Sequence, residues 1–319
     1  MLPLSGMPYL AELNLLIVSV DGGRSPNRRL RFFRCNNHQG LYCTTDESGF
    51  WIRSPKVVVQ QVITTIKKLL AHPDTHDLSI DDPRTTERRR GIIQSNRFLW
   101  QIYDEWYRLI ASSIPSGAGS VLELGSGAGF LSRYIPDLIT SEVFPCSEAK
   151  LVLDGRQLPF SAASLKAIVM VDVLHHIPDS RAFLAEASRC VRPGGSILMI
   201  EPWVSAWSRL IYTHLHHEPF QPGAKDWQFP DTGPLSGANG ALPWIIFRRD
   251  RSEFESGFPE LAIRVVRPFM PFRYLVSGGV SMRQLMPAAA FGVWRQMESW
   301  LGRWPDHWSM FAFIQLERR

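Results

Sequence analysis

The sequence is poor in cysteine and has no long apolar run. Its four cysteines are scattered without a repeating interval, which fits a reducing compartment better than a disulfide framework. A membrane-spanning helix needs ~20 apolar residues, and the longest candidate, at 15–20, is too short. Residues 1–14 contain no basic region, so no secretory signal is predicted. We therefore expect a cytoplasmic protein.

Internal repeats and low-complexity tracts are also lacking. Hydrophobic residues make up 45% of the 319 residues and charged residues 20%, which is ordinary for a globular protein. This length suits one large domain with insertions, or one and a half domains. The chain has 11 tryptophans, many of them after residue 200. They indicate a large apolar cleft or a membrane-facing surface in the C-terminal half.

The net charge of +5 comes from local groups of arginines. A solvated face is the simplest interpretation, and anionic lipid or a phosphorylated substrate is the alternative. No recognisable RNA-binding module accompanies the arginines, so no nucleic-acid partner is expected. The two groups are Arg24, Arg28, Arg29, Arg31 and Arg34, and Arg84, Arg88, Arg89 and Arg90.

Residues 1–56 form an N-terminal extension whose role the pattern does not indicate. Apolar stretches at 13–20 and 28–35 are strand candidates. Cys35, His38 and Cys43 have the spacing C-x2-H-x4-C. A structural zinc site takes four ligands, and no fourth ligand follows at a convincing interval, so no metal site is predicted there.

Residues 57–117 are expected to form a helical cap region. Apolar residues at helical spacing predict a helix from 57 to about 72. The polar, turn-rich stretch 72–90 predicts a surface connection. A 3.6-residue period then predicts a single amphipathic helix over 90–113, ended by the proline and glycines of 113–119.

From residue 118 to 319 apolar strands alternate with helices, and 203–250 lacks clean periodicity and is interpreted as an insertion. Near-continuous apolar strands separated by helices are typical of a parallel sheet with both faces covered. The strands are predicted at 120–126, 138–144, 149–155, 165–177, 196–202, 261–269 and 310–317. Helices are predicted from 130, over 180–191 and over 250–258.

The stretch VLELGSGAGFL at 121–131 places three glycines at alternate positions after the first of these strands. Gly125 and Gly127 fit the first two positions of the dinucleotide pattern G-x-G-x-x-G, but Phe130 stands at the third and would crowd a pyrophosphate. The third glycine is Gly129, one residue early. No Lys-Ser/Thr pair follows, which excludes a P-loop.

Read as E-x-G-x-G-x-G, with Glu123 before the glycines, the stretch resembles the first motif of class I S-adenosylmethionine-dependent methyltransferases. DGRQLPF and MVDVLHHIPD with RCVRPGGSILMIEP resemble the small-molecule, type 11-like branch, and the resemblance covers residues 118–202. It implies a Rossmann-like α/β fold with a mostly parallel seven-stranded sheet and helices on both faces. The N-terminal extension and a C-terminal lid at about 203–250 would be added to that fold.

The resemblance also implies where S-adenosylmethionine binds. Glu142, closing the second strand, would hold the ribose hydroxyls, because a carboxylate accepts two charge-assisted hydrogen bonds. Asp154, closing the third strand, would hold the adenine amino group. Asp172 would line the pocket through its backbone, or serve structure through its side chain. The full predicted cofactor set is Glu123, Gly125, Ser126, Gly127, Gly129, Glu142, Asp154, Gly155 and Asp172.

Three residues are candidates for catalysis. His175 and His176 follow the fourth strand, and Glu201 ends the fifth, at the edge where the acceptor would arrive. A histidine suits the role of general base at neutral pH, and the alternative for either is an orienting or capping role. A second polar group, interpreted as a patch in the lid and not as a metal site, comprises His214, His216, His217 and Glu218.

The expected function is methyl transfer from S-adenosylmethionine to a small-molecule or lipid-like acceptor. Peripheral contact with a membrane is a second kind of partner that the tryptophans and arginines allow. An RNA or protein methyltransferase is one alternative, weakened because DVLHHI stands where an N-P-P-Y-type signature would be. A non-catalytic S-adenosylmethionine-binding protein is the other. The acceptor atom and the oligomeric state are not indicated.

Overall fold

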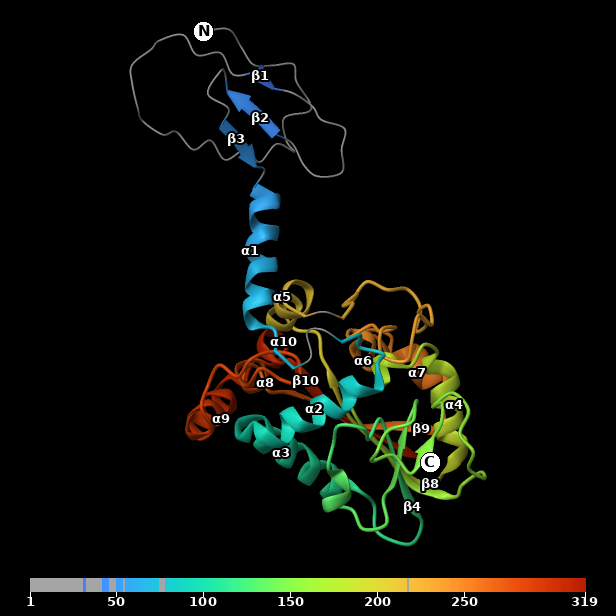
Figure 1. The fold of residues 1–319 in the computed structure, drawn as a ribbon. Coiled ribbons are helices and arrows are strands. Elements are labelled where there is room, and N and C mark those ends of the chain that lie inside the picture. Colours follow the sequence, from blue (N-terminus) through green and yellow to red (C-terminus); the bar gives the residue numbers. More distant parts are fainter. Residues whose placement is uncertain (1–30, 33–41, 46–49, 54, 75–77, 217) are drawn as a thin grey trace, which may run out of the picture. The chain divides into compact units, whose positions relative to one another are not determined.

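The structure is a computed structural model that describes residues 31–32, 42–45, 50–53, 55–74, 78–216 and 218–319 (Figure 1). The chain divides into two compact units, Met1–Leu69 and Leu70–Arg319. No helix within the described ranges is long and apolar enough to cross a membrane. The strand predicted at 13–20 and the side chains of Cys35, His38 and Cys43 lie outside the described part.

The first unit contains a small antiparallel sheet in the order β1-β2-β3. The helix predicted from 57 to 72 is α1, Pro55–Leu70. Of the strand predicted at 28–35, the structure describes only the two residues of β1. The three strands are β1 Arg31–Phe32, β2 Tyr42–Thr45 and β3 Phe50–Arg53.

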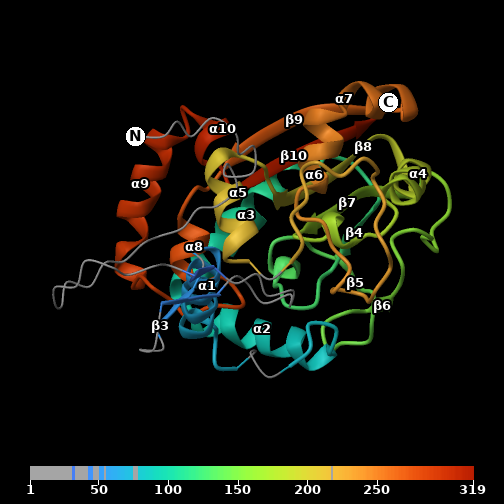
Figure 2. The ribbon, with the colours of Figure 1, turned by 90° about the horizontal axis from the view of Figure 1, so that it is seen from above.

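The second unit is built on a seven-stranded sheet in the order β6-β5-β4-β7-β8-β10-β9, which Figure 2 shows from above. The first five pair in parallel and β10 is antiparallel to both neighbours. The prediction of a mostly parallel seven-stranded Rossmann-like sheet is confirmed. The strands are β4 Ser120–Leu124, β5 Ile139–Glu142, β6 Leu151–Val152, β7 Leu165–Val171, β8 Val191–Pro202, β9 Leu261–Phe269 and β10 Phe311–Arg318.

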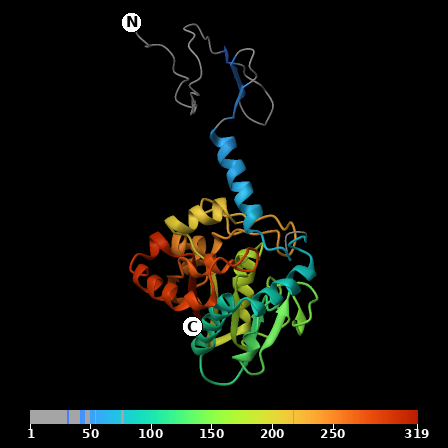
Figure 3. The ribbon, with the colours of Figure 1, turned by 60° about the vertical axis from the view of Figure 1, so that its left-hand side comes forward.

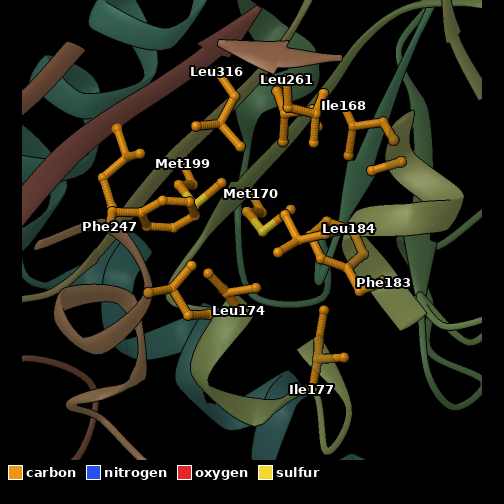
Figure 4. Close-up of a cluster of buried hydrophobic side chains, with 14 of the residues drawn as sticks. Ile168, Met170, Leu174, Ile177, Phe183, Leu184, Met199, Phe247, Leu261 and Leu316 are labelled. Atoms are coloured by element: carbon orange, nitrogen blue, oxygen red, sulfur yellow. The ribbon is translucent and has the colours of Figure 1, made fainter. Parts of the chain in front are cut away.

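Both faces of the sheet are buried, because successive side chains of each strand point to opposite sides. Ile168 and Met170 of β7 belong to one hydrophobic cluster, and Ala167 and Val169 to the other. Figure 4 shows the first cluster, where α4 (Ser180–Cys190) packs on the sheet. Fully burying each such Ile or Met contributes about 1.5–3 kcal/mol. These apolar strands therefore place their carboxyl ends along one stable edge.

The second face is covered by two helices where the periodicity predicted one. The helix expected over 90–113 is broken into α2, Pro83–Ser95, and α3, Arg97–Ser113, which run in different directions (Figure 1). At the break, the Asn96 side chain accepts a hydrogen bond from the Leu99 amide at 3.0 Å. It also donates to the Ser277 carbonyl at 2.8 Å. An N-cap and a distant partner end the first helix, although the apolar period continues through it.

The expected surface connection over 72–90 is wrong in its second half. Asp82 accepts a hydrogen bond from the Arg84 amide at 2.9 Å, and Pro83 takes the first helical position. Both are start signals of a helix. The run of arginines that follows therefore belongs to α2, not to a loop.

The helix predicted from Phe130 is absent. A single 3-10 turn, Leu131–Arg133, occupies its place. The Phe130 ring stacks on Trp100 of α3 at 5.5 Å and meets the Tyr107 ring edge-on at 4.9 Å. Pro136 lacks the N–H that would continue a helix. The aromatic face of α3 thus packs on the segment that was expected to form a helix of its own.

The C-terminal half holds further helices around the antiparallel end of the sheet, shown from another side in Figure 3. The region 203–250 was predicted without regular structure, yet it contains α5, α6 and a π-helical turn at Ile245–Arg249. The helix predicted over 250–258 is α7. The helices are α5 Ala206–His214, α6 Leu242–Trp244, α7 Arg251–Gly257, α8 Arg273–Ser277, α9 Phe291–Leu301 and α10 Pro305–Trp308.

Candidate active site

Two glycines of the turn after β4 leave no space for a side chain. Gly125 has a φ of +70°, and a Cβ added there would lie 2.4 Å from Cγ2 of Val173. At Gly127 an added Cβ would lie 2.4 Å from Cγ2 of Thr86 and 2.8 Å from Oε2 of Glu142. Both distances are far below van der Waals contact, so any substitution must move neighbouring atoms. The turn is compressed between β5, the segment after β7, and α2.

Gly129 is needed for a different reason. A Cβ at this position would lie 2.2 Å from the hydroxyl oxygen of Tyr107 on α3. Tyr107 is 2% exposed and packs edge-on against Phe130. The third glycine of the motif therefore leaves space for the Tyr107 side chain of α3. The motif itself does not indicate this packing role.

Ser126 fastens β4 to β5. Its hydroxyl accepts a hydrogen bond from the Ser141 amide at 3.0 Å, and its amide donates to the Ser141 carbonyl at 2.9 Å. The Ser141 hydroxyl donates to the carbonyl of Glu123 at 2.7 Å. These bonds hold the glycine turn at the carboxyl edge of the sheet.

Three carboxyl groups lie at this edge. Glu142 accepts hydrogen bonds from the Gly127 amide at 3.1 Å and the Val143 amide at 3.0 Å, and burial raises its pKa. Burial also raises the pKa of Glu123, to about 7, with the nearby Glu142 charge adding to the effect. At Asp154, burial is outweighed by hydrogen bonds from Arg156, so its pKa is lowered.

A cavity of about 230 Å³ runs along the same edge. At one end it is bounded by the glycine turn and by the ends of β5 and β6. At the other it is bounded by tyrosines and apolar side chains from α3, α5 and α8. Of the predicted cofactor residues, those that line it are Glu123, Gly125, Gly129, Glu142, Asp154, Gly155 and Asp172, while Ser126 and Gly127 lie behind the lining.

His175 and Glu201 are buried behind the cavity wall. Both side chains are 0% exposed, and Nδ1 of His175 lies 2.8 Å from Oε2 of Glu201. The other carboxylate oxygen of Glu201 accepts hydrogen bonds from the amides of Val173 and Leu174. Burial opposes a charge on His175, but Glu201 and Glu218 outweigh it and raise its pKa well above the usual value. Neither group reaches the cavity.

His176, in contrast, lines the cavity. Its Nδ1 lies 3.4 Å from the carbonyl oxygen of Gly237, and its Nε2 lies 3.7 Å from Oε1 of Glu218. Burial, and the charge of His175, lower the pKa of His176 to about 3. His176 is therefore neutral at physiological pH.

Asp172 also lines the cavity. It has a φ of 63°, an uncommon conformation for a residue other than glycine. Its Oδ1 lies 4.0 Å from Nε2 of His175. Burial raises the pKa of Asp172 to about 6, although His175 opposes the shift.

A loop at 218–240, named the cavity loop here, closes one side. Asp81 accepts hydrogen bonds from the amides of Leu235 and Ser236 at 2.7 and 2.8 Å, and the Asn239 amide donates to the His175 carbonyl at 2.9 Å. Within 203–250, this loop lines the cavity together with α5 residues and His216, whereas Ile245 and Ile246 are core residues.

Several cavity residues were not predicted as part of the site. Glu218 had been placed only in a polar patch of the lid, and its contact with His175 and His176 joins segments far apart in sequence. His216 and Glu218 line the cavity, His214 does not, and His217 is outside the described residues. The helical period of α3 was the available signal for Tyr103 and Tyr107. The others are Thr86 and Arg89 of α2, where a surface connection was expected, Tyr212 of α5 and Tyr274 of α8.

Comparison with known proteins shows that part of this chain matches a family model. Residues 122–199 match the family model described as a methyltransferase domain. This segment runs from β4, through the glycine turn and the acidic strand ends, into β8.

Solved structures with partial similarity include three that cover most of this chain. A putative methyltransferase of Haloferax volcanii, in complex with the Trm112 methyltransferase activator, has 13% identity and a TM-score of 0.46, covering 76% of this chain and 98% of that one. Geranyl diphosphate C-methyltransferase of Streptomyces coelicolor has 13% identity and a TM-score of 0.44, covering 82% and 98%. The YcgJ protein of Bacillus subtilis has 15% identity and a TM-score of 0.40, covering 68% and 99%. Similarities at this level carry no argument.

The domain match, the strand order and the glycine turn agree with one another. The match spans the segment whose motif resembles the cofactor-binding part of methyltransferases. Its strands are the five parallel strands of the sheet, from β6 at one edge to β8, with the glycine turn at their carboxyl ends. Together these show that residues 122–199, on the sheet of the second unit, are similar to a methyltransferase domain.

Proposed function

We propose that the protein transfers the methyl group of S-adenosylmethionine to a small-molecule or lipid-like acceptor held in the inner part of the cavity. The observation that carries the proposal is that a single cavity is lined both by the glycine turn and by Tyr103, Tyr212 and Tyr274. Pockets for small ligands are mostly apolar with a few polar groups. Residues of the cavity loop also line this cavity, and an enclosed space suits a compact acceptor better than a polymer.

The cofactor would lie across the outer part. Glu142 would accept hydrogen bonds from the ribose hydroxyls, since the Gly127 amide already holds its carboxylate in place. Asp154 would accept a hydrogen bond from the adenine amino group while keeping its ion pair with Arg156. The methionine moiety would lie along Gly125, beside Glu123. The other predicted cofactor residues support this arrangement through the turn itself.

The predicted catalytic residues would have unequal roles. Of the two predicted catalytic histidines, His176 lines the cavity and would be the one to contact a bound acceptor. His175 and Glu201 would act as positioning residues, because both are fully buried and Glu201 holds the turn that carries the histidines. Methyl transfer is an in-line displacement, and alignment of the acceptor with the methyl group is the main contribution of the protein.

Removal of the Glu142 charge tests the cofactor part of the proposal. Glu142→Gln should weaken S-adenosylmethionine binding by about 10- to 150-fold, which corresponds to the 1.5–3 kcal/mol of a hydrogen bond to a charged group. Calorimetric titration measures the change. Asp306→Asn removes an exposed carboxylate on α10 and is the matched control. Equal affinities for wild type and Glu142→Gln would contradict the placement of the ribose.

Transfer of a labelled methyl group to a cell extract tests the acceptor class. Label in the organic-soluble or small-molecule fraction is the expected result. Label in RNA or protein would contradict the proposal and support the corresponding macromolecular acceptor. Cofactor binding without transfer to any fraction would instead support a non-catalytic role.

A further inference from the structure

Two adjacent histidines direct the same ring atom toward one carboxylate. His175 and His176 lie on the 3-10 turn after β7, with ring centroids 4.2 Å apart. Nε2 of His175 lies 3.4 Å from Oε2 of Glu218, and Nε2 of His176 lies 3.7 Å from Oε1. We propose that these three side chains bind a divalent transition-metal ion, of the Zn²⁺ or Fe²⁺ class, in the wall of the acceptor cavity.

The outer contacts of the histidines are those of metal ligands. A metal-ligating histidine usually donates its other ring N–H to a carboxylate or a backbone carbonyl. Nδ1 of His175 lies 2.8 Å from Glu201, and Nδ1 of His176 lies 3.4 Å from the carbonyl of Gly237. Two amides, those of Val173 and Leu174, hold Glu201 in turn. With each Nδ1 directed at an acceptor, each Nε2 is the atom available to a ligand.

A second observation is independent of the cluster. Nε2 of His175 is buried on a side chain that is 0% exposed, and within the described part its contact at 3.4 Å with Oε2 of Glu218 does not have the geometry of a hydrogen bond. A buried polar atom without a hydrogen bond calls for an explanation, and binding to an ion is one. This atom faces Oε2 of Glu218, and the metal would lie between the two atoms.

The separations also fit a metal. With metal–nitrogen and metal–oxygen distances of about 2.0–2.2 Å, tetrahedral ligands are about 3.4 Å apart. The two observed histidine–carboxylate distances, 3.4 and 3.7 Å, are close to this value, and one ligand atom from each of the three side chains lies within 4.8 Å of the others. Two imidazoles and one carboxylate are a ligand set of Zn²⁺ and of non-haem Fe²⁺ sites. Asp172, whose Oδ1 lies 4.0 Å from Nε2 of His175, adds negative charge on the cavity side.

The site would keep an open position toward the acceptor, because His176, Glu218 and Asp172 all line the cavity. This role rests on the proposed function. A hydroxyl of the acceptor bound to the metal would lose its proton to water more readily. The resulting oxygen would attack the methyl carbon, the carbon–sulfur bond would break, and sulfur would keep the electron pair as S-adenosylhomocysteine forms.

Cobalt titration of the full chain tests the site without an acceptor. After chelator treatment and dialysis, the protein should bind one equivalent of Co²⁺ with visible ligand-field absorption that Zn²⁺ displaces. Glu218→Gln should weaken binding by at least about 100-fold, and Glu201→Gln by about 10- to 100-fold. His214→Gln, in an exposed histidine outside the cavity lining, is the matched control.

The alternative arrangement is an ion pair between a protonated His175 and Glu218, which needs no metal. Wild type that binds no Co²⁺, or that binds it equally well after Glu218→Gln, would overturn the proposal in favour of that pair. His176→Asn, compared by circular dichroism and S-adenosylmethionine binding, replaces Glu218→Gln if that variant fails to fold. Co²⁺ binding without methyl transfer would refute only the proposed function, and transfer by a chain that binds no metal would refute only the site.

Discussion

Glu123 offers a stability test of the glycine turn. The residue is the last but one of β4, beside the turn, and is 5% exposed. Its pKa is raised to about 7: burial is the main cause, the nearby Glu142 charge adds to it, and a hydrogen bond with Ser126 opposes both. Glu123→Gln keeps the shape of the side chain and removes the titration. The variant therefore isolates the free energy of holding a carboxylate at this position.

The sign follows from the direction of the shift. When the pKa of an acid is higher in the folded than in the unfolded state, folding favours the protonated form of that acid. The stabilisation is complete below about pH 4.5 and is lost as the pH rises through about 7. At 1.36 kcal/mol per pKa unit, the difference between the folded-state pKa of about 7 and the ordinary value of 4.5 corresponds to about 3 kcal/mol of unfolding free energy. Glu123→Gln should match wild type near pH 4.5 and be more stable by up to about 3 kcal/mol at pH 8.5.

Urea unfolding of both proteins across pH 4.5–9, without cofactor, measures this difference from the midpoints and slopes. Glu255→Gln, an exposed carboxylate on α7, is the control and should show little pH-dependent difference from wild type. A free-energy difference between wild type and Glu123→Gln that does not grow with pH would refute the reasoning. So would a variant that becomes less stable than wild type at alkaline pH.

Three further substitutions test the surroundings of the site. Gly129→Ala should cost about 1–3 kcal/mol in unfolding free energy, because its Cβ would lie 2.2 Å from the Tyr107 hydroxyl; adding Tyr107→Phe should recover part of the loss, and additive effects would contradict the contact. Asn96→Ala should cost about 1–2 kcal/mol through the lost cap and the lost bond to Ser277, measured by thermal unfolding, and a neutral change would contradict both roles. Asp81→Ala should speed amide exchange in the cavity loop without changing S-adenosylmethionine affinity, and unchanged exchange would show that other contacts hold the loop.

The sheet was predictable because its signal is local. Near-continuous apolar strands followed by turns or helices indicate parallel strands buried on both faces. The strands predicted at 261–269 and 310–317 appear at Leu261–Phe269 and Phe311–Arg318. The carboxyl edge of such a sheet is where ligands bind, so most predicted cofactor residues line one cavity.

The helices were less predictable, because contacts distant in sequence decide where they begin and end. The apolar period runs through Asn96, and only its bond to Ser277, far along the chain, shows why the helix stops there. The segment after Phe130 has a helical appearance but gives way to packing against Tyr107. Local propensity is a weak signal where tertiary packing opposes it.

Part of the candidate site could not be predicted either, because it too depends on contacts between residues distant in sequence. His175 and His176 were visible from their place after a strand, and their equal standing as candidates was reasonable from sequence. Burial separates them, since His176 lines the cavity and His175 does not. Glu218 lies on a loop without periodicity, so nothing local indicates that its carboxylate meets both rings.

The glycine turn depends on residues outside the matched methyltransferase segment. Thr86 of α2 and Tyr107 of α3 fill the space that Gly127 and Gly129 leave. The Ser147 hydroxyl, between β5 and β6, donates to Glu87 of α2 at 2.7 Å. The two helices therefore hold the turn and the neighbouring loop from the second face of the sheet. Because a turn under this degree of contact keeps its conformation only while its neighbours are present, α2 and α3 belong to the candidate cofactor site as much as the motif does.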